Sequence, residues 1–304
     1  MLKVSTDKCR AELGSSSCET LNQVQGDELL CSRFPLRKNS TFLAVKLFLI
    51  FSFASFSQKP VIIAHRGASA YAPENTLRAF EKAIEMGALV IETDVHQTKD
   101  SVIVIMHDLS VNRTTNGEGL IKNLTVDEFH KLIISPVASS EVEKQQEIIH
   151  APTLEEAIIA INGRCKLLIE LKKGSSYYPG IEKHIVDLID KYKAHSWIYT
   201  IHSFEKEALV NIAKRDSSIN LQKLIVFKLP LVSFNFDKHF NKDDYNNWQG
   251  VNVYYRFCSK RLVKKLHALG KTVYVWTVNK PRIARKMARR GVDGIITNKP
   301  DILK

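Results

Sequence analysis

The stretch Val61–Asp108, VIIAHRGASAYAPENTLRAFEKAIEMGALVIETDVHQTKDSVIVIMHD, decides the fold of this chain. Two short apolar runs, Val61–Ala64 and Val90–Val95, have the length and composition of buried strands. Between them, apolar residues recur at helical spacing from Leu77 to Ile84, after a helix start at Asn75-Thr76. The stretch therefore predicts a strand–helix–strand unit, the repeating element of α/β proteins.

Ionisable residues stand where each of these strands ends. His65-Arg66-Gly67 closes the first run, and Glu92 and Asp94 lie two residues apart on the second, so they share one face of that strand. In barrels built from alternating strands and helices, active sites lie at the carboxyl ends of the strands. These side chains are therefore candidates for one catalytic site.

A third apolar run, Val102–Met106, follows the second strand and ends in His107-Asp108. The connection Gln97–Ser101 is too short for a parallel crossover, which predicts an antiparallel hairpin. A turn centred on Lys99-Asp100 would place His107 opposite Glu92, on the same side of the hairpin. We therefore expect His107 to join the same site.

Further strands are predicted downstream, mostly followed by helical patterns. Together with the two above, they begin near residues 61, 90, 166, 197, 223, 251, 272 and 294. Eight strands that alternate with mostly helical links predict an α/β fold, a (β/α)8 TIM barrel over residues 61–304. Residues 109–152, after the His107 strand, have little strand character and are interpreted as a small insertion, with a helix at Val126–Ile134.

Several short blocks occur together in a fixed order: HRG at 65–67, PENT at 73–76, an ExD pair at 92–94, HD at 107–108, ELK at 170–172, WTVN at 276–279 and GIITN at 294–298. In these blocks the chain resembles the glycerophosphodiester phosphodiesterases, over roughly residues 61–304. It departs from the family pattern at Leu89, Ser101 and Asn298, where the family usually has Asp, Gly and Asp. The resemblance implies a barrel of the PLC-like phosphodiesterase type.

Three carboxylates are the candidate metal ligands. Glu92, Asp94 and Glu170 are all predicted at strand ends, where like charges repel each other unless a cation joins them. Ligation by oxygen alone suits Ca²⁺ or Mg²⁺ rather than Zn²⁺, and the resemblance implies that these residues hold a divalent cation. The alternative is that Arg66 and Lys172 neutralise the three carboxylates by ion pairs.

His65 and His107 are the candidate catalytic residues. Imidazole titrates near neutral pH, so one ring can accept a proton while the other donates one. The resemblance gives both rings catalytic roles and does not divide acid from base. Arg66 and Lys172 are interpreted as phosphate-binding cations, because negative charge grows on the phosphate oxygens in the transition state.

Three further residues are interpreted as substrate-binding. Glu74 and Asn75 follow the His65 loop in sequence and would position it. Trp276 ends a predicted strand, where it lines either the polyol of the substrate or the core of the barrel.

The composition agrees with an enzyme that binds small anions. The chain has 304 residues, 44% of them hydrophobic, and a formal net charge of +12, which favours anionic ligands. It contains no nucleic-acid-binding motif, so we expect no nucleic-acid partner. Neither Cys165 nor Cys258 shows metal-ligand spacing.

The sequence before the barrel has two parts. Residues 1–40 are polar and aperiodic, and are interpreted as disordered or as an untranslated extension. Residues 41–57 follow basic residues, are largely apolar and end in small residues, which is the pattern of a signal peptide cleaved before Gln58. We therefore expect a periplasmic or secreted enzyme with no stable membrane span after cleavage. An uncleaved membrane anchor and a core helix are the alternatives.

Together these features predict metal-dependent hydrolysis of small-molecule glycerophosphodiesters to glycerol 3-phosphate and an alcohol, within phospholipid and glycerol metabolism. Either water or the substrate's own glycerol 2-hydroxyl serves as the nucleophile. One alternative is head-group release from lysophospholipids, as by a lysophospholipase D, which needs an apolar channel beside the site. The other is a glycosidase barrel that uses Glu92 and Asp94 as an acid pair, which leaves both histidines and both cations without a role.

Overall fold

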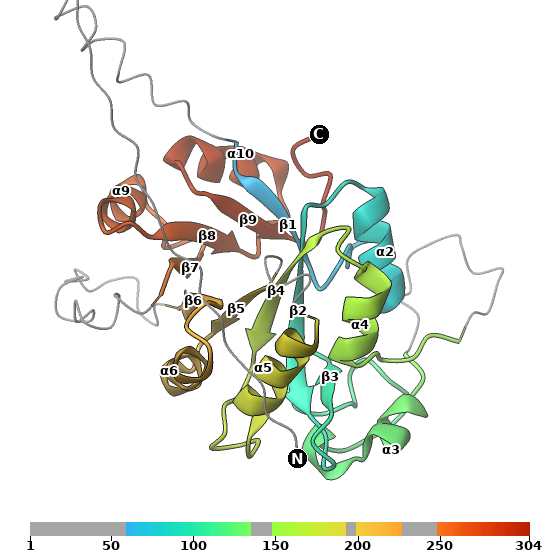
Figure 1. Cartoon of the computed structure of the whole chain (residues 1–304). Helices are drawn as coiled ribbons and strands as arrows, with labels where there is room; N and C mark the ends of the chain where they lie inside the picture. The colour runs from blue at the N-terminus through green and yellow to red at the C-terminus, as the bar shows by residue number, and fades with distance from the viewer. Residues whose placement is uncertain (1–58, 135–147, 193–198, 227–247) are drawn as a thin grey trace, which may run out of the picture. The chain divides into compact units, whose positions relative to one another are not determined.

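Eight parallel strands close into a barrel in the computed structural model, which describes residues 59–134, 148–192, 199–226 and 248–304 (Figure 1). In their order around the barrel they are β1 (Val61–His65), β9 (Gly294–Thr297), β8 (Thr272–Trp276), β7 (Gly250–Tyr254), β6 (Asn220–Ile225), β5 (Tyr199–Ser203), β4 (Lys166–Leu171) and β2 (Val90–Gln97). The pairing of β1 with β2 closes the ring, and β3 (Ile103–Ile105) adds to β2 as an antiparallel arm. The predicted TIM barrel is confirmed.

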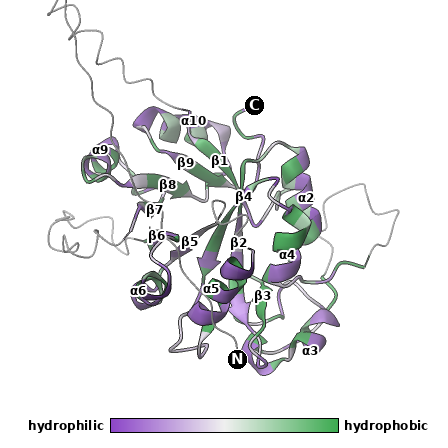
Figure 2. Cartoon of the chain, viewed as in Figure 1, coloured by the Kyte–Doolittle hydropathy of each residue, from purple (hydrophilic) through white to green (hydrophobic). Residues whose placement is uncertain are grey.

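Helices cover the outside of the barrel where the chain returns between strands (Figure 1). They are α2 (Leu77–Glu85), α4 (Leu154–Ile161), α5 (Ile181–Lys191), α6 (Lys206–Arg215), α9 (Lys260–Ala268) and α10 (Pro281–Arg290). Thr76 caps α2, and Thr153 forms a capping box with Glu156 at the start of α4. Figure 2 shows hydrophobic colour on the central strands and both colours on the helices, as expected for helices that bury one face.

Apolar packing fills the space between the barrel and its helices, and also the inside of the barrel. Phe80 of α2 and Ile91 of β2 are fully buried in the larger cluster between strands and helices. Inside the barrel, Ile63, Leu168 and Ile296 form a smaller buried cluster. Because these side chains fill the interior, the barrel has room for a polar pocket at the carboxyl ends of the strands.

The hairpin after β2 forms, but its predicted register is wrong by one residue. The prediction pairs Val95 with Val104, whereas in the structure Val95 lies opposite Ile105. Ser101 adopts a φ of 69°, which extends the turn to three residues between Thr98 and Val102. As a result, His107 is not paired with Glu92 as predicted. It lies after the end of β3.

Two other predicted elements have different bounds. Within the region predicted as an insertion, residues 109–134 and 148–152 are described, and they contain a 3-10 helix, η1 (Ile121–Asn123), and α3 (Val126–His130). α3 ends before Ile134 because that residue's N–H donates to the carbonyl of Ile149. β6 begins at Asn220, three residues before the predicted start, because polar residues interrupt its apolar pattern.

The extension at 1–40 and the predicted signal peptide at 41–57 lie outside the described residues. Within the described ranges, no helix is both long enough and apolar enough to cross a membrane.

Candidate active site

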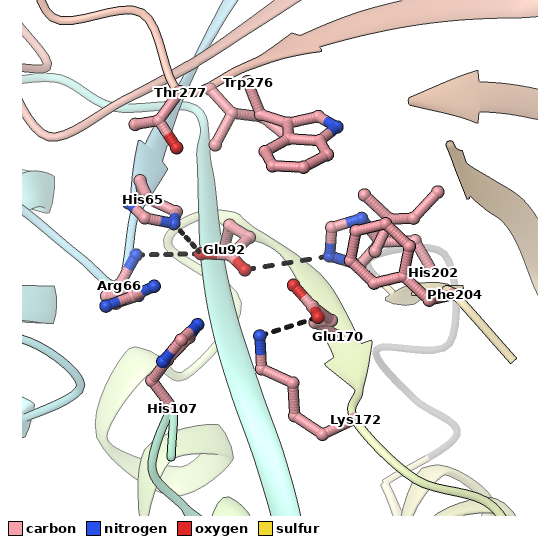
Figure 3. A pocket seen from close by; sticks show the side chains of 12 residues that line it. His65, Arg66, Glu92, His107, Glu170, Lys172, His202, Phe204, Trp276 and Thr277 are labelled. Carbon is pink, nitrogen blue, oxygen red and sulfur yellow. Dashed lines mark hydrogen bonds and ion pairs between the residues drawn. The ribbon is translucent and has the colours of Figure 1, made fainter. Parts of the chain in front are cut away.

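A pocket opens at the carboxyl ends of the strands, where the sequence places its ionisable residues (Figure 3). Its cavity volume is about 100 Å³. Seven predicted site residues line it, namely both candidate histidines and both candidate cations, together with Glu92, Glu170 and Trp276. Asp94, Glu74 and Asn75 are not among the residues that line it.

A tight turn at the end of β1 brings His65 and Arg66 to the pocket. Arg66 has a φ of 54° and Gly67 a φ of 79°. A Cβ atom at Gly67 would stand 2.7 Å from the backbone of Ala79, so only glycine fits. The turn aims the backbone N–H of Arg66 at Glu92 Oε2, which accepts a hydrogen bond of 2.9 Å. Part of the HRG block therefore serves to hold a carboxylate in place.

Both histidines are held through their Nδ1 atoms. Nδ1 of His65 lies 2.7 Å from Oδ1 of Asn298, and Nδ1 of His107 lies 2.7 Å from Oδ1 of Asp108. Asp108 also accepts a hydrogen bond from Arg113. With Nδ1 occupied in each ring, Nε2 is the atom left for the pocket, and Nε2 of His65 is 3.9 Å from Glu92 Oε2. This is the arrangement that acid–base chemistry requires.

Asp94 is fully buried, and nearby cations and donors hold both of its oxygens. Lys172 Nζ lies 2.8 Å from Oδ1, Arg66 Nε lies 3.2 Å from Oδ2, and Asn75 Nδ2 donates to Oδ2 at 2.8 Å. Burial raises the pKa of Asp94, but Lys172 and Arg66 outweigh it and hold the pKa well below its usual range. The ion-pair interpretation of Arg66 and Lys172 therefore describes the ligand-free geometry, and phosphate binding by them stays a prediction.

Glu92 and Glu170 differ in how well their charges are compensated. Burial and Asp94 raise the pKa of Glu92, but His65 and His202 lower it, and the net shift is downward. Burial raises the pKa of Glu170, and the pull of Lys172, whose Nζ is 2.6 Å from Oε1, does not cancel it. Glu170 is therefore the carboxylate that would gain most from a bound cation.

The buried donors fit a divalent cation. Glu92, Glu170 and His202 each offer a ligand atom, and these atoms lie within 4.8 Å of one another. Asp94 is not in this group, so its role as a ligand stays a prediction. His202 is the residue that sequence reasoning missed, although the signal was present: it is an ionisable residue at a strand end, as His65 is.

Glu74 and Asn75 make positioning contacts. Glu74 Oε1 accepts hydrogen bonds from Arg66 at 2.9 Å and from Arg113 at 2.6 Å. Asn75 is buried, and its side chain bonds Asp94 and Thr93. These contacts fix the loop after His65, as the sequence analysis expects, while direct contact of either residue with substrate stays a prediction.

Trp276 combines the two roles that the sequence left open. Its side chain packs against the apolar cluster inside the barrel and also lines the pocket (Figure 3). It meets Phe204 edge to face at 5.7 Å between ring centroids, and Tyr254 at 5.5 Å. The aromatic rings form an apolar wall on the side of the pocket away from His107.

Known proteins are similar in sequence to this chain over the barrel. A profile of the glycerophosphoryl diester phosphodiesterase family matches residues 65–302. A putative glycerophosphodiester phosphodiesterase of Bacillus subtilis is 35% identical over 242 residues, which cover 80% of this chain and 96% of that protein. A glycerophosphodiester phosphodiesterase of Caldanaerobacter subterraneus is 34% identical over 246 residues, covering 81% of this chain and 96% of that protein.

Solved structures share the fold. An Oleispira antarctica phosphodiesterase, solved in complex with the product sn-glycerol-3-phosphate, has a TM-score of 0.68 at 28% identity, covering 81% of this chain and 95% of that one. A putative glycerophosphoryl diester phosphodiesterase from Silicibacter pomeroyi has a TM-score of 0.69 at 25% identity, covering 81% and 92%. Since the family match extends from the first candidate histidine almost to the last residue, the chain belongs to the glycerophosphoryl diester phosphodiesterase family.

Proposed function

We propose that this pocket hydrolyses glycerophosphodiesters to glycerol 3-phosphate and an alcohol, with the help of a divalent cation. One observation carries the proposal: the rings of His65 and His107, two basic side chains and two buried carboxylates line the same pocket. A phosphodiester needs this combination, because its reaction requires proton transfer at two oxygens and compensation of growing negative charge.

Arg66 and Lys172 bind the phosphate in this proposal. Both side chains are only 15–16% exposed, so little water competes for their charge. Arg66 contacts Asp94 and Glu74, and Lys172 contacts Asp94 and Glu170. Both basic side chains also line the pocket, where a substrate phosphate can compete with these carboxylates. The planar guanidinium of Arg66 suits two phosphate oxygens at once.

His65 and His107 move the protons. One Nε2 atom takes the proton of the nucleophile, and the other supplies a proton to the leaving alcohol oxygen. Asn298 and Asp108 keep the two rings oriented through Nδ1. Water as the nucleophile gives glycerol 3-phosphate in one step. The glycerol 2-hydroxyl as the nucleophile expels the alcohol and gives a cyclic phosphate, which water then opens to glycerol 3-phosphate; the same two rings serve both routes.

The candidate cation ligands are Glu92, Asp94 and Glu170. A bound Ca²⁺ or Mg²⁺ supplies positive charge that neutralises the phosphate and the carboxylates together. Two features support a cation at this place. The pKa of Glu170 is raised, and the carboxylates of Glu92 and Glu170 are both buried and lie close to each other.

A structure of a similar enzyme supports the assignment of glycerol 3-phosphate as one half of the substrate. The Oleispira antarctica enzyme was solved with that product, and the wall formed by Trp276 and Phe204 gives this pocket an apolar side for a carbon backbone. A glycosidase that used a carboxylate pair would need neither the histidines nor the cations that line this pocket.

A substrate panel tests the proposal. Glycerophosphocholine, glycerophosphoethanolamine, glycerophosphoinositol and a lysophospholipid are each incubated with the enzyme in Ca²⁺, Mg²⁺ or EDTA, and glycerol 3-phosphate is quantified. We expect release from the glycerophosphodiesters with a cation and none in EDTA. Turnover of the lysophospholipid alone would favour head-group release from lipids, and no turnover of any substrate would refute the proposal.

We also propose that the mature enzyme begins at Gln58, just before the barrel, and lies in the periplasm or in the secreted fraction. The support is the signal-peptide pattern at 41–57, which ends just before β1. Amino-terminal sequencing of the native protein should begin at Gln58. A native protein that begins at Met1 would refute this location and its processing.

A further inference from the structure

His202, the residue before the last of β5, lies beside the pocket and is almost completely buried. In the sheet it pairs in register with Glu170 of β4, and only 1% of the residue is exposed. Among the described residues, its Nε2 atom has no hydrogen-bond partner. The nearest carboxylate oxygen, Glu92 Oε1, is 3.7 Å away, which is too long for a hydrogen bond. Figure 3 shows the ring directed toward Glu92 and Glu170.

A second buried histidine shows what a structural role looks like in this barrel. His96 of β2 is also fully buried, but both of its ring nitrogens have partners. Nε2 lies 3.2 Å from the carbonyl of His107, and Nδ1 lies 3.0 Å from the hydroxyl of Tyr178. Packing and hydrogen bonding account for His96, whereas they leave one nitrogen of His202 directed at two carboxylates.

Asn252 of β7 fixes the other side of the His202 ring. Its amide nitrogen, Nδ2, lies 2.7 Å from Nδ1 of His202, and its Oδ1 has no hydrogen-bond partner among the described residues. The two orientations of an amide are equivalent in shape. With the oxygen turned toward His202, Nδ1–H donates to it and Nε2 presents a lone pair to Glu92 and Glu170. Metal-bound histidines usually donate their second N–H to such an oxygen.

We propose that His202 is a nitrogen ligand of the divalent cation, beside Glu92 and Glu170, and that it shifts the preference of the site toward Co²⁺ or Zn²⁺. The donor atoms of these three residues already lie within 4.8 Å of one another. Imidazole favours transition metals, whereas ligands made only of oxygen favour Ca²⁺ and Mg²⁺. The inference rests on the proposed function only in placing a cation in this pocket.

Pulsed electron paramagnetic resonance tests the ligand directly. The full chain is stripped of metal, loaded with Mn²⁺, and examined for the electron spin echo modulation of a directly bound imidazole nitrogen. We expect the modulation in the wild type and its loss in His202→Gln. His96→Gln is the matched control, since it removes an equally buried histidine, and His65→Gln removes the other ring near Glu92. Both should keep the modulation.

Each other outcome overturns the inference. The proposal fails if the wild type lacks nitrogen modulation, if His202→Gln retains it, or if His65→Gln is the variant that loses it. His202→Ala repeats the measurement should the glutamine variant not fold. Because the signal requires no turnover, an enzyme that is inactive on glycerophosphodiesters but shows the modulation would refute the proposed function and leave the ligand assignment intact.

Metal affinity tests the selectivity. Calorimetric titration of His202→Gln should show a Kd for Co²⁺ at least roughly tenfold weaker than in the wild type, the scale of loss seen when the surroundings of a metal site are disturbed. The Kd for Ca²⁺ should change far less, because the glutamine oxygen replaces the lost nitrogen. Equal losses for the two ions would show that His202 does not set the preference.

Discussion

Removing the positive charge of Lys172 should strongly destabilise the cation-free enzyme. Lys172 Nζ contacts Asp94 Oδ1 at 2.8 Å and Glu170 Oε1 at 2.6 Å, and its side chain is only 15% exposed. Lys172→Met keeps the length of the side chain and removes the charge. Asp94, with no exposed surface, then keeps only Arg66 and Asn75 as side-chain partners, both at Oδ2, and cannot regain water.

The size of the effect follows from this burial. Breaking a buried ion pair from one side costs about 3–5 kcal/mol of unfolding free energy, because the remaining charge has no water around it. For a domain of this size, about 2–4 °C of melting temperature accompanies each kcal/mol, so the loss is roughly 6–20 °C. Lys183 is a matched control, since it pairs with Asp187 on the exposed face of α5, and Lys183→Met should cost about 0–1 kcal/mol.

Urea unfolding in EDTA measures these free energies, and a second variant identifies the cause. Adding Asp94→Asn to Lys172→Met removes the uncompensated charge, so most of the lost stability should return. The reasoning is refuted if Lys172→Met costs no more than Lys183→Met. It is also refuted if the double variant is no more stable than Lys172→Met alone.

Three further predictions concern the pocket. His65→Ala and His107→Ala should each lower kcat by roughly 10²–10⁴ with little change in melting temperature, and near-normal turnover would remove that residue from the mechanism. Arg66→Lys should be more active than Arg66→Ala yet less active than the wild type, because lysine lacks the planar fork; equality with the wild type would indicate a charge role alone. In EDTA at pH 7, Glu170→Gln should unfold at a higher urea concentration than the wild type, since the raised pKa of Glu170 means that its ionised form opposes folding. This advantage should shrink as the pH falls toward the ordinary pKa of glutamate. A difference in stability that does not change with pH would contradict the raised pKa.

Local signals in the sequence were enough to place most of the pocket. The strands that carry His65, Glu92 and Glu170 are short apolar runs that end in charged residues, and in a parallel barrel every such end lies on the same face. The reason for Gly67 became visible only in the structure, where its positive φ and its close contact with Ala79 exclude other residues from the turn after His65.

What the sequence did not reveal depends on contacts between distant residues. The hairpin register depends on one residue, Ser101, whose left-handed backbone conformation lengthens the turn. The position of His202 depends on the register of β5 against β4 and on Asn252, fifty positions later. The pairing of Asp94 with Lys172 and Arg66 likewise requires three strand ends to be placed in space.

The melting temperature with and without a divalent cation tests most directly whether the carboxylate cluster is a metal site. A cation at a hundred times its Kd stabilises the folded enzyme by about 2.7 kcal/mol, a rise of roughly 5–11 °C for a domain of this size. We expect this rise in the wild type and a much smaller one in Glu92→Gln, which should also lose turnover. A wild-type melting temperature that no cation changes, together with full activity in EDTA, would contradict both the metal site and the mechanism built on it.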